Sequence, residues 1–320
     1  MKRVGILVLL ALLSGGTLLA QRYRGGGRGY GGGNWGGGGY GGGEGWLPED
    51  APVRTAREVP RHSYDMPEWT NTAGFGKDVF TFVRVQYHRG YKPNGARRAG
   101  YCFTDFPDSD LNLSYRLQQL TSLKVDPDGR VLRLTDPELF KYAFIYMVEP
   151  GAMEFSEEEV TALRQYLLSG GFLMADDFWG PKEWENFEDE IKRALPERNF
   201  SFKELQQDHP IFNCVFQLKI SPDKRELQTP NYRQGELSET DIAEDGRHRT
   251  WEYHDGEECR EMHVRAITDD AGRIMVIACH NTDNGDGWER EQENGYFFRE
   301  FSEKRAYPLG INIIVYAMTH

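Results

Sequence analysis

The sequence predicts an α/β fold, a doubly wound, mostly parallel, flavodoxin-like sheet with an added hairpin. The main observation is residues 144–177, where an apolar run, an amphipathic helix and a second apolar run follow one another. A third apolar run covers residues 274–278. None of these runs alternates with polar residues, which is typical of strands that helices cover on both faces. A strand, a crossover helix and a parallel strand form a right-handed unit in nearly all proteins, so this unit fixes the expected topology.

The helix inside this unit is predicted to begin near Ser156 and to end at Gly170 and Gly171. Ser156 and Glu159 have the spacing of a capping box, and residues 157–159 put three glutamates at the positive end of the helix dipole. A glycine at the end supplies the left-handed conformation that often stops a helix. Helical spacing predicts the residues of the inward face, which are Val160, Leu163, Leu167 and Leu168.

The other elements are predicted from periodicity and turn residues. Before the central unit we expect a strand at 79–85, a helix at 110–122, a short strand at 131–134 and a helical connection at 136–142. After it we expect a helix at 181–195, a loop at 209–212, a polar insertion at 222–258, a hairpin of 260–267 and 273–279, and a last helix at 307–318. Residues 281–287 carry closely spaced oxygen side chains, but a plain turn is favoured over a calcium loop because the closing acidic residue is out of register.

Charge and the N-terminal segments bear on location and partners. The net charge is −12 and the pI about 5.2, which argues against nucleic acid because phosphates require a basic surface. Residues 1–20 have the charged start, apolar core and small-residue end of a secretory signal, with an uncleaved anchor as the alternative. Residues 21–45 are Gly-rich and predicted to be a disordered tether, with an RNA-binding tail as the alternative, and 46–76 form a linker to a domain at 77–320. The expected location is periplasmic or extracellular, with no membrane span after the signal is cleaved.

Several motifs in order resemble the DUF4159 family: residues 104–113, 139–140, 170–177, 209–212 and 309–312. The resemblance implies a fold similar to the class I glutamine amidotransferases, a group that also includes non-catalytic domains of glycosidases. Catalytic members of that group carry a nucleophilic cysteine on a tight turn after a strand. The two corresponding turns here, 149–151 and 176–178, contain no cysteine, so amidotransferase chemistry is not expected. The resemblance therefore implies a fold and no specific function.

Acidic residues gather at the predicted carboxyl ends of the strands, where ligands bind in open α/β sheets. Glu149, Asp176 and Asp177 follow or end the two central strands, and Asp105 and His280 are expected at the same edge. Asp176 and Asp177 are candidate ligands of a divalent cation, Mg²⁺ or Ca²⁺, although one of them capping the following helix is the alternative. Crowding raises the pKa of a carboxyl group, which then can serve as a general acid. His280 is either a base or ligand, or a side chain satisfied by a backbone carbonyl.

Two further sets of residues leave alternatives open. An exported protein can pair its cysteines, but their spacing fixes no connectivity and gives no metal motif. These cysteines are Cys102, Cys214, Cys259 and Cys279. Three aromatic residues near predicted strand ends form either a rim for carbohydrate or ordinary packing. They are Tyr101, Trp179 and Trp288.

The sequence favours an exported binding or scaffold module over an enzyme, because no catalytic motif is complete. The expected partner is a cell-envelope glycan or protein, and a divalent cation is the candidate cofactor. The alternative is a metal-assisted hydrolase that acts on a cell-envelope or carbohydrate substrate. That alternative requires its candidate catalytic side chains to lie within hydrogen-bond or ligand reach of one another. They are Asp105, Glu149, Asp176, Asp177 and His280.

Overall fold

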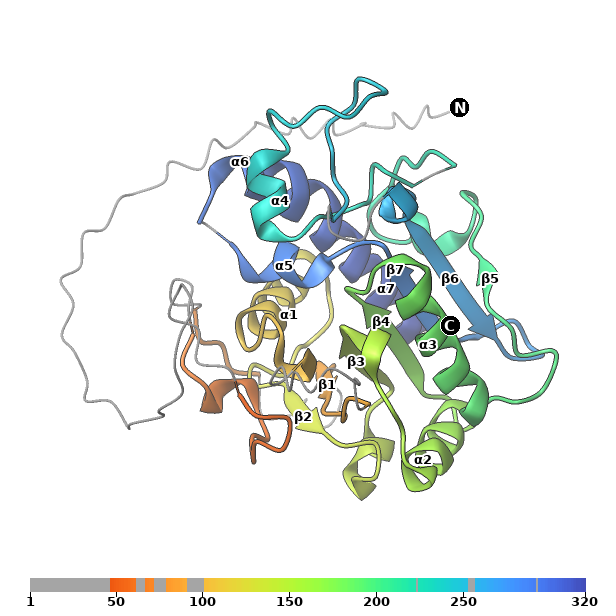
Figure 1. Ribbon diagram of the computed structural model, residues 1–320. Helices are drawn as coiled ribbons and strands as arrows, with labels where there is room; N and C mark the ends of the chain where they lie inside the picture. Colours follow the sequence, from red (N-terminus) through yellow and green to blue (C-terminus); the bar gives the residue numbers. More distant parts are fainter. Residues whose placement is uncertain are drawn as a thin grey trace, which may run out of the picture. The chain divides into compact units, whose positions relative to one another are not determined.

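A seven-stranded sheet forms the centre of the structure, a computed structural model (Figure 1). Its strand order is β2-β1-β3-β4-β7-β6-β5. The five strands from β2 to β7 are parallel, whereas β6 and β5 pair antiparallel at one edge. The strands are β1 Val83–Val85, β2 Arg130–Leu132, β3 Phe144–Val148, β4 Phe172–Asp176, β5 Lys203–Glu204, β6 His263–Thr268 and β7 Ile274–His280. The predicted parallel, flavodoxin-like sheet and the added hairpin of β6 and β7 are both confirmed.

The structure describes residues 47–61, 67–71, 79–90, 101–222, 224–252, 257–291 and 293–320. All of them belong to a unit that spans residues 46–320, and the predicted signal and Gly-rich segments lie outside the described residues. The α-helices are α1 Asp108–Leu120, α2 Glu157–Leu168, α3 Gly180–Ala194, α4 Tyr232–Leu237, α5 Asn284–Glu289, α6 Gly295–Phe297 and α7 Tyr307–Thr319. Within the described ranges, no helix has the length and apolar character needed to cross a membrane.

Shorter helical turns complete the chain, and a π-helix, η8 (Phe298–Ala306), leads directly into α7. The 3-10 turns are η1 Ala56–Glu58, η3 Tyr101–Phe103, η4 Pro137–Lys141, η5 Pro150–Ala152, η6 Pro210–Phe212 and η7 Glu257–Cys259. The helical connection predicted at 136–142 corresponds to η4. The π-helix was not predicted, because the last helix was expected to begin only at residue 307.

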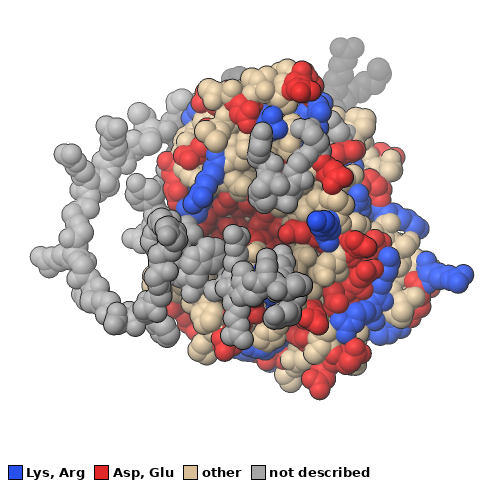
Figure 2. Space-filling view, viewed as in Figure 1, with Lys and Arg blue, Asp and Glu red and all other residues tan. Residues whose placement is uncertain are grey.

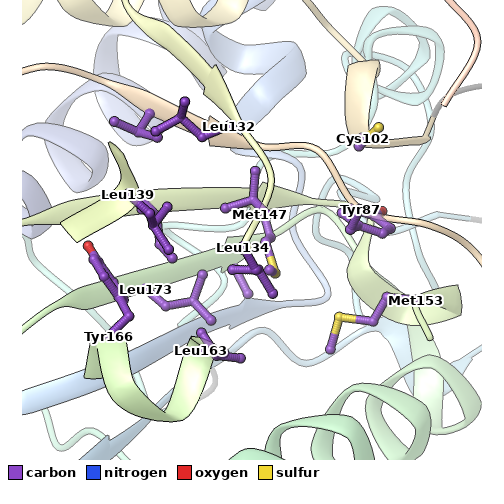
Figure 3. Packing of buried hydrophobic residues seen from close by; sticks show 14 of the residues in the cluster. Tyr87, Cys102, Leu132, Leu134, Leu139, Met147, Met153, Leu163, Tyr166 and Leu173 are labelled. Carbon is purple, nitrogen blue, oxygen red and sulfur yellow. The ribbon is translucent and has the colours of Figure 1, made fainter. Parts of the chain in front are cut away.

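Two hydrophobic layers cover the two faces of the sheet, which explains the apolar runs of β3, β4 and β7. Ile145 and Met147 of β3 pack in one layer with α2 and α3, whereas Phe144, Tyr146 and Val148 pack in the other with α1 and α7. Figure 3 shows part of the first layer, between α2 and the sheet. Successive residues of a strand point to opposite faces, so a strand covered on both sides needs apolar residues at every position.

The central unit forms as its local signals indicate, except that Leu168, predicted on the inward face of the helix, is exposed. Ser156 Oγ accepts a hydrogen bond from the Glu159 backbone N–H at 3.2 Å, and the Glu159 carboxylate accepts one from the Ser156 N–H at 2.9 Å. This reciprocal pair is the predicted capping box. Gly170 has a φ of 109°, a left-handed conformation at the end of the helix that a side chain rarely adopts.

Three predicted segments differ from the structure. The strand at 79–85 is regular only over β1, although Phe80 forms an isolated bridge to Val125. The polar insertion at 222–258 contains helix α4. The plain turn predicted at 281–287 is wrong, because α5 begins there: Asp283 Oδ1 accepts from the Asp286 N–H at 2.7 Å and caps a helix.

The N-terminal part of the described chain packs onto the edge of the sheet. Ala51, Val53 and Ala56 are buried in the layer that contains α2. The carbonyl of Arg54 accepts a hydrogen bond from the backbone N–H of Val131 in β2 at 2.9 Å. This part of the predicted linker therefore contributes to the core.

Candidate functional site

Acidic residues with a strained backbone lie where the central strands end. Glu149 follows β3 and Asp177 follows β4, and they are adjacent because Val148 pairs with Asp176 in the parallel register. Glu149, Asp177 and Asp105 have φ values of 45°, 58° and 61°. Asn281, which follows β7, has a φ of 60°. These are four of the five non-glycine residues with positive φ in the described chain, and such strain clusters at functional sites.

Arg84 of β1 anchors the segment that carries Asp105. Its guanidinium is fully buried and pairs with Asp110 of α1, with Nε at 3.0 and 3.1 Å from the two carboxylate oxygens. It also donates to the carbonyls of Cys102 and Thr104 at 3.1 and 3.0 Å. These contacts hold residues 102–110 against the end of the sheet, which places Asp105 beside the strand ends.

Asp176, the last residue of β4, is fully engaged in holding the start of α5. Its carboxylate accepts hydrogen bonds from the Asn284 N–H at 2.9 Å, the Asn284 side-chain amide at 2.7 Å and the Gly285 N–H at 3.2 Å. Burial nevertheless raises its pKa to about 7. The alternative in which one of the two aspartates caps the following helix, α3, is wrong. Asp176 holds α5 instead, and the Gly180 N–H at the start of α3 donates to Asn281 Oδ1 at 2.8 Å.

Asp105, Asp177 and Asp283, here called the aspartate triad, form a compact group. One carboxylate oxygen from each lies within 4.8 Å of the others. Asp177 and Asp283 are buried and Asp105 is half-buried. Burial, together with the neighbouring carboxylates, raises the pKa of all three well above the ordinary value. Figure 2 shows acidic side chains lining a hollow near the centre of the face in view.

A second group, here called the arginine-paired triad, consists of Asp105, Asp286 and Glu289, again with oxygens within 4.8 Å of one another. Arg290 Nε lies 2.6 Å from a Glu289 oxygen and 3.7 Å from Asp286 Oδ1. The backbone N–H of Tyr232 also donates to Asp286 Oδ2 at 2.5 Å. The negative charge of Asp286 and Glu289 is therefore balanced by groups of the protein itself.

Three buried oxygens of this region have neither a hydrogen-bond nor an ion-pair partner among the described residues. They are Asp105 Oδ2, Glu149 Oε2 and Asn284 Oδ1. Asp105 Oδ2 lies directly over Gly285, where an added Cβ would approach it to 2.1 Å. The same Cβ would lie 3.5 Å from Asp283 Oδ1, so the unpartnered oxygen faces the start of α5. Buried acceptors without partners are rare in proteins and indicate a missing donor, water or ion.

Glu149 presents one bonded and one free oxygen. Thr104 Oγ1 donates to Glu149 Oε1 at 3.1 Å. Burial is the main cause that raises the Glu149 pKa to about 8, with further contributions from Glu183 and Glu252. At neutral pH this carboxyl group is mostly protonated, as a general acid must be.

His280 faces away from the carboxylates. Its Nε2 lies 2.9 Å from the Gly180 carbonyl, and its ring packs against Phe178 and Trp184. Burial lowers its pKa to about 3. The alternative in which a backbone carbonyl satisfies this histidine therefore describes its contacts. The structure brings Asp105, Glu149 and Asp177 together, engages Asp176 with α5, and leaves His280 outside the group.

The aromatic residues and cysteines do not extend the site. Trp179 and Trp288 are buried, so they form packing and not an exposed carbohydrate rim. Trp179 also donates from Nε1 to Asp177 Oδ1 at 3.0 Å and so orients that carboxylate. The four cysteines are free, and three of them, Cys102, Cys259 and Cys279, are buried.

Asp283, Asp286 and Glu289 belong to the site but were not predicted as site residues. The available signal was the polar run 281–287 that directly follows the buried strand β7, just as Asp177 follows β4. The resemblance to a calcium loop drew attention to Asp283 and Asp286. A calcium loop takes its ligands from one short segment, whereas the acidic residues near these two include Asp105 and Asp177 from distant parts of the chain.

The family model for DUF4159, described as a domain of unknown function, matches residues 81–318. A search of curated proteins finds no match. The matched region contains every strand of the sheet and all residues of the two triads. The chain belongs to the DUF4159 family.

Proposed function

We propose that the domain is an exported binding module whose ligand occupies the acidic cleft at the carboxyl ends of β3, β4 and β7. The observation that carries this proposal is the pair of unpartnered buried oxygens, Asp105 Oδ2 and Glu149 Oε2, beside further buried carboxylates. Groups arranged to bind a ligand lower the stability of the folded protein while the ligand is absent. Uncompensated carboxylates and a strained backbone at one sheet edge carry such a cost.

Export is supported by the sequence of residues 1–20, which has the features of a secretory signal, and by the Gly-rich tether that follows it. Mass spectrometry of the mature protein tests this part. We expect its N-terminus near Gln21, after the small residue Ala20. A cytoplasmic protein that retains Met1 contradicts export and leaves the cleft proposal untouched.

Isothermal titration calorimetry tests the binding function. The full chain is titrated separately with Ca²⁺, with Mg²⁺ and with soluble cell-wall glycan fragments. We expect saturable heat from at least one of them, and its loss in Asp177→Asn, which keeps the shape of the side chain and its acceptor for Trp179. A protein that gives no heat with the whole panel contradicts the proposal.

A metal-assisted hydrolase is the second candidate, and the state of Glu149 favours it. Burial raises the pKa of Glu149 to about 8, so this side chain holds a proton near neutral pH, as the general acid of a hydrolase must. Under this proposal Glu149 donates a proton to the leaving group, and Asp105 and Asp177 hold the cation. Glu149→Gln should then lower the rate of glycan or ester hydrolysis by about 10²–10⁴ while ligand affinity persists. If the wild type and Glu149→Gln hydrolyse the substrate equally slowly, Glu149 is not a general acid.

A further inference from the structure

We infer that the ligand of the cleft is a hard divalent cation, Ca²⁺ or Mg²⁺, held by the aspartate triad of Asp105, Asp177 and Asp283. This inference rests on the proposed binding function and names the ligand. The three residues come from three separate parts of the chain: the segment before α1, the end of β4 and the cap of α5. The fold, and not a local loop, therefore assembles this group.

The spacing of the triad suits one cation. Oxygen ligands lie about 2.3–2.6 Å from Ca²⁺ and about 2.0–2.1 Å from Mg²⁺. Two oxygens on opposite sides of one Ca²⁺ are therefore roughly 4.8 Å apart, twice the bond length. All three oxygens of the triad lie within 4.8 Å of one another, a spacing compatible with one Ca²⁺ between them, whereas Mg²⁺ requires the oxygens to move closer together.

The oxygens are also prepared for an ion by the hydrogen bonds they make. Asp177 uses Oδ1 to accept from Trp179, and Asp283 uses Oδ1 to accept from the Asp286 N–H at 2.7 Å. Each carboxylate is thus oriented through one oxygen, and the described residues donate no hydrogen bond to the other. Such outer contacts fix ligands in metal sites. Asp105 Oδ2 is buried and has no hydrogen-bond partner in the part of the chain that the structure describes, which points to a missing ligand independently of the clustering.

Charge separates the aspartate triad from the arginine-paired triad. Among the residues that the structure describes, no basic side chain forms an ion pair with Asp105, Asp177 or Asp283, although Arg84 and Arg290 act on Asp105 from a greater distance. Arg290 forms ion pairs with both Asp286 and Glu289. Buried carboxylates are paired, protonated or bound to a metal, so the triad without an arginine is the one whose charge a cation would balance.

A sugar fits the same group less well. A hydroxyl donates a hydrogen bond but brings no positive charge to three crowded carboxylates. Asp177 and Asp283 are only 6% and 3% exposed, so a sugar ring does not reach them without displacing protein atoms. The neighbouring Trp179 and Trp288 are buried and offer no surface for stacking.

The test is calorimetry and thermal unfolding of the full chain, after treatment with a chelator, with Ca²⁺ and Mg²⁺ in separate titrations. We expect one ion per chain and a rise of about 5–10 °C in the unfolding midpoint at a free-ion concentration about 100 times Kd. Asp105→Asn, Asp177→Asn and Asp283→Asn should each weaken affinity by at least about tenfold. Asparagine accepts the left-handed conformation of Asp105 and Asp177, so these variants keep the local backbone.

The matched control is Glu157→Gln, the same kind of change at an exposed glutamate of α2, which should bind the ion as the wild type does. Glu289→Gln, the corresponding change in the arginine-paired triad, tests the choice of triad. Affinity lost in Glu289→Gln and kept in Asp177→Asn overturns the choice of triad. A wild-type chain that binds neither ion overturns the inference itself. If that chain still binds glycan fragments and Asp177→Asn does not, the binding function stands and only the cation is excluded.

Discussion

Single residues at the carboxyl ends of β3 and β4 lower the stability of the folded protein. Asp177 combines a left-handed backbone, a buried carboxylate and two acidic neighbours, Glu149 and Asp105, whose charges raise its pKa. A left-handed conformation costs a non-glycine residue about 1–2 kcal/mol. Nothing in the packing of the core requires an aspartate here, because among the described residues its side chain accepts a hydrogen bond from Trp179 alone. The residue is best explained by a ligand that the free protein lacks.

This explanation predicts that Asp177→Asn stabilises the cation-free protein. The variant keeps the acceptor for Trp179 and removes a charge that burial and the neighbouring carboxylates disfavour. We expect the free energy of unfolding to rise by about 0.5–2 kcal/mol, the usual range for a single stabilising change. Denaturant unfolding in a chelating buffer measures it.

Asp286→Asn provides the comparison. Asp286 accepts from the Tyr232 N–H and lies near Arg290, so its charge is already compensated. The same change should therefore lower stability or leave it unchanged. Equal destabilisation by both variants would show that Asp177 is an ordinary structural residue.

At the scale of elements, the buried pair of Arg84 and Asp110 connects β1, α1 and the segment that carries Asp105. Side-chain exposure is 0% for Arg84 and 4% for Asp110. Breaking such a pair by removing one partner leaves an uncompensated buried charge, which costs about 3–5 kcal/mol. We therefore expect Asp110→Asn to lower the free energy of unfolding by about that amount, as measured by urea denaturation.

The exposed pair of Arg193 and Glu157, 2.8 Å apart, is the matched control, since 89% of the Glu157 side chain is exposed. Glu157→Gln should cost no more than about 1 kcal/mol. Adding Arg84→Met to Asp110→Asn should recover part of the loss, because no charge is then left alone. A double variant no more stable than Asp110→Asn would argue against the charge as the cause.

The elements that local chemistry specifies are the ones that the sequence predicts well. The unit from β3 to β4 follows from apolar runs, a capping box and a terminal glycine, all within 144–177. The start of α5 was not predicted, because Asp176, more than a hundred residues earlier, holds its first N–H groups. The local signal is a single capping aspartate, Asp283, before a Gly-containing polar run, and such a run fits a turn as well as a helix.

The candidate site was predicted where it depends on which strands end together, and missed where it depends on the directions of side chains. Asp105, Glu149 and Asp177 were expected at one edge, since parallel strands deliver their carboxyl ends to the same side. That Asp176 faces α5 and that Asp283 completes the triad depends on side-chain directions at the strand ends. The left-handed backbone at Glu149 and Asp177 was equally hidden, because neither residue is a glycine.

For the whole molecule, the buried acids control how stability depends on pH. The Glu149 pKa is about 8 in the folded protein, against an ordinary value of 4.5. Between these values the folded state holds a proton that the unfolded state has released, so stability falls as pH rises. His280 acts in the opposite direction at lower pH: its pKa falls from 6.5 to about 3, so stability falls as pH drops below 6.5.

The two effects separate above pH 6.5, where His280 is neutral in the folded state and mostly neutral in the unfolded chain, so its contribution fades. From pH 6.5 to 8 we expect the cation-free protein to lose stability, at no more than about 1.4 kcal/mol per pH unit for each proton. Glu149→Gln keeps the acceptor for Thr104 and has no proton to release, so its stability should fall less steeply over this range. Thermal unfolding at several pH values in a chelating buffer measures both slopes. Parallel slopes for the wild type and Glu149→Gln would mean that Glu149 has the same pKa in the folded and unfolded states. Its carboxyl group would then be more exposed to water than its contacts indicate.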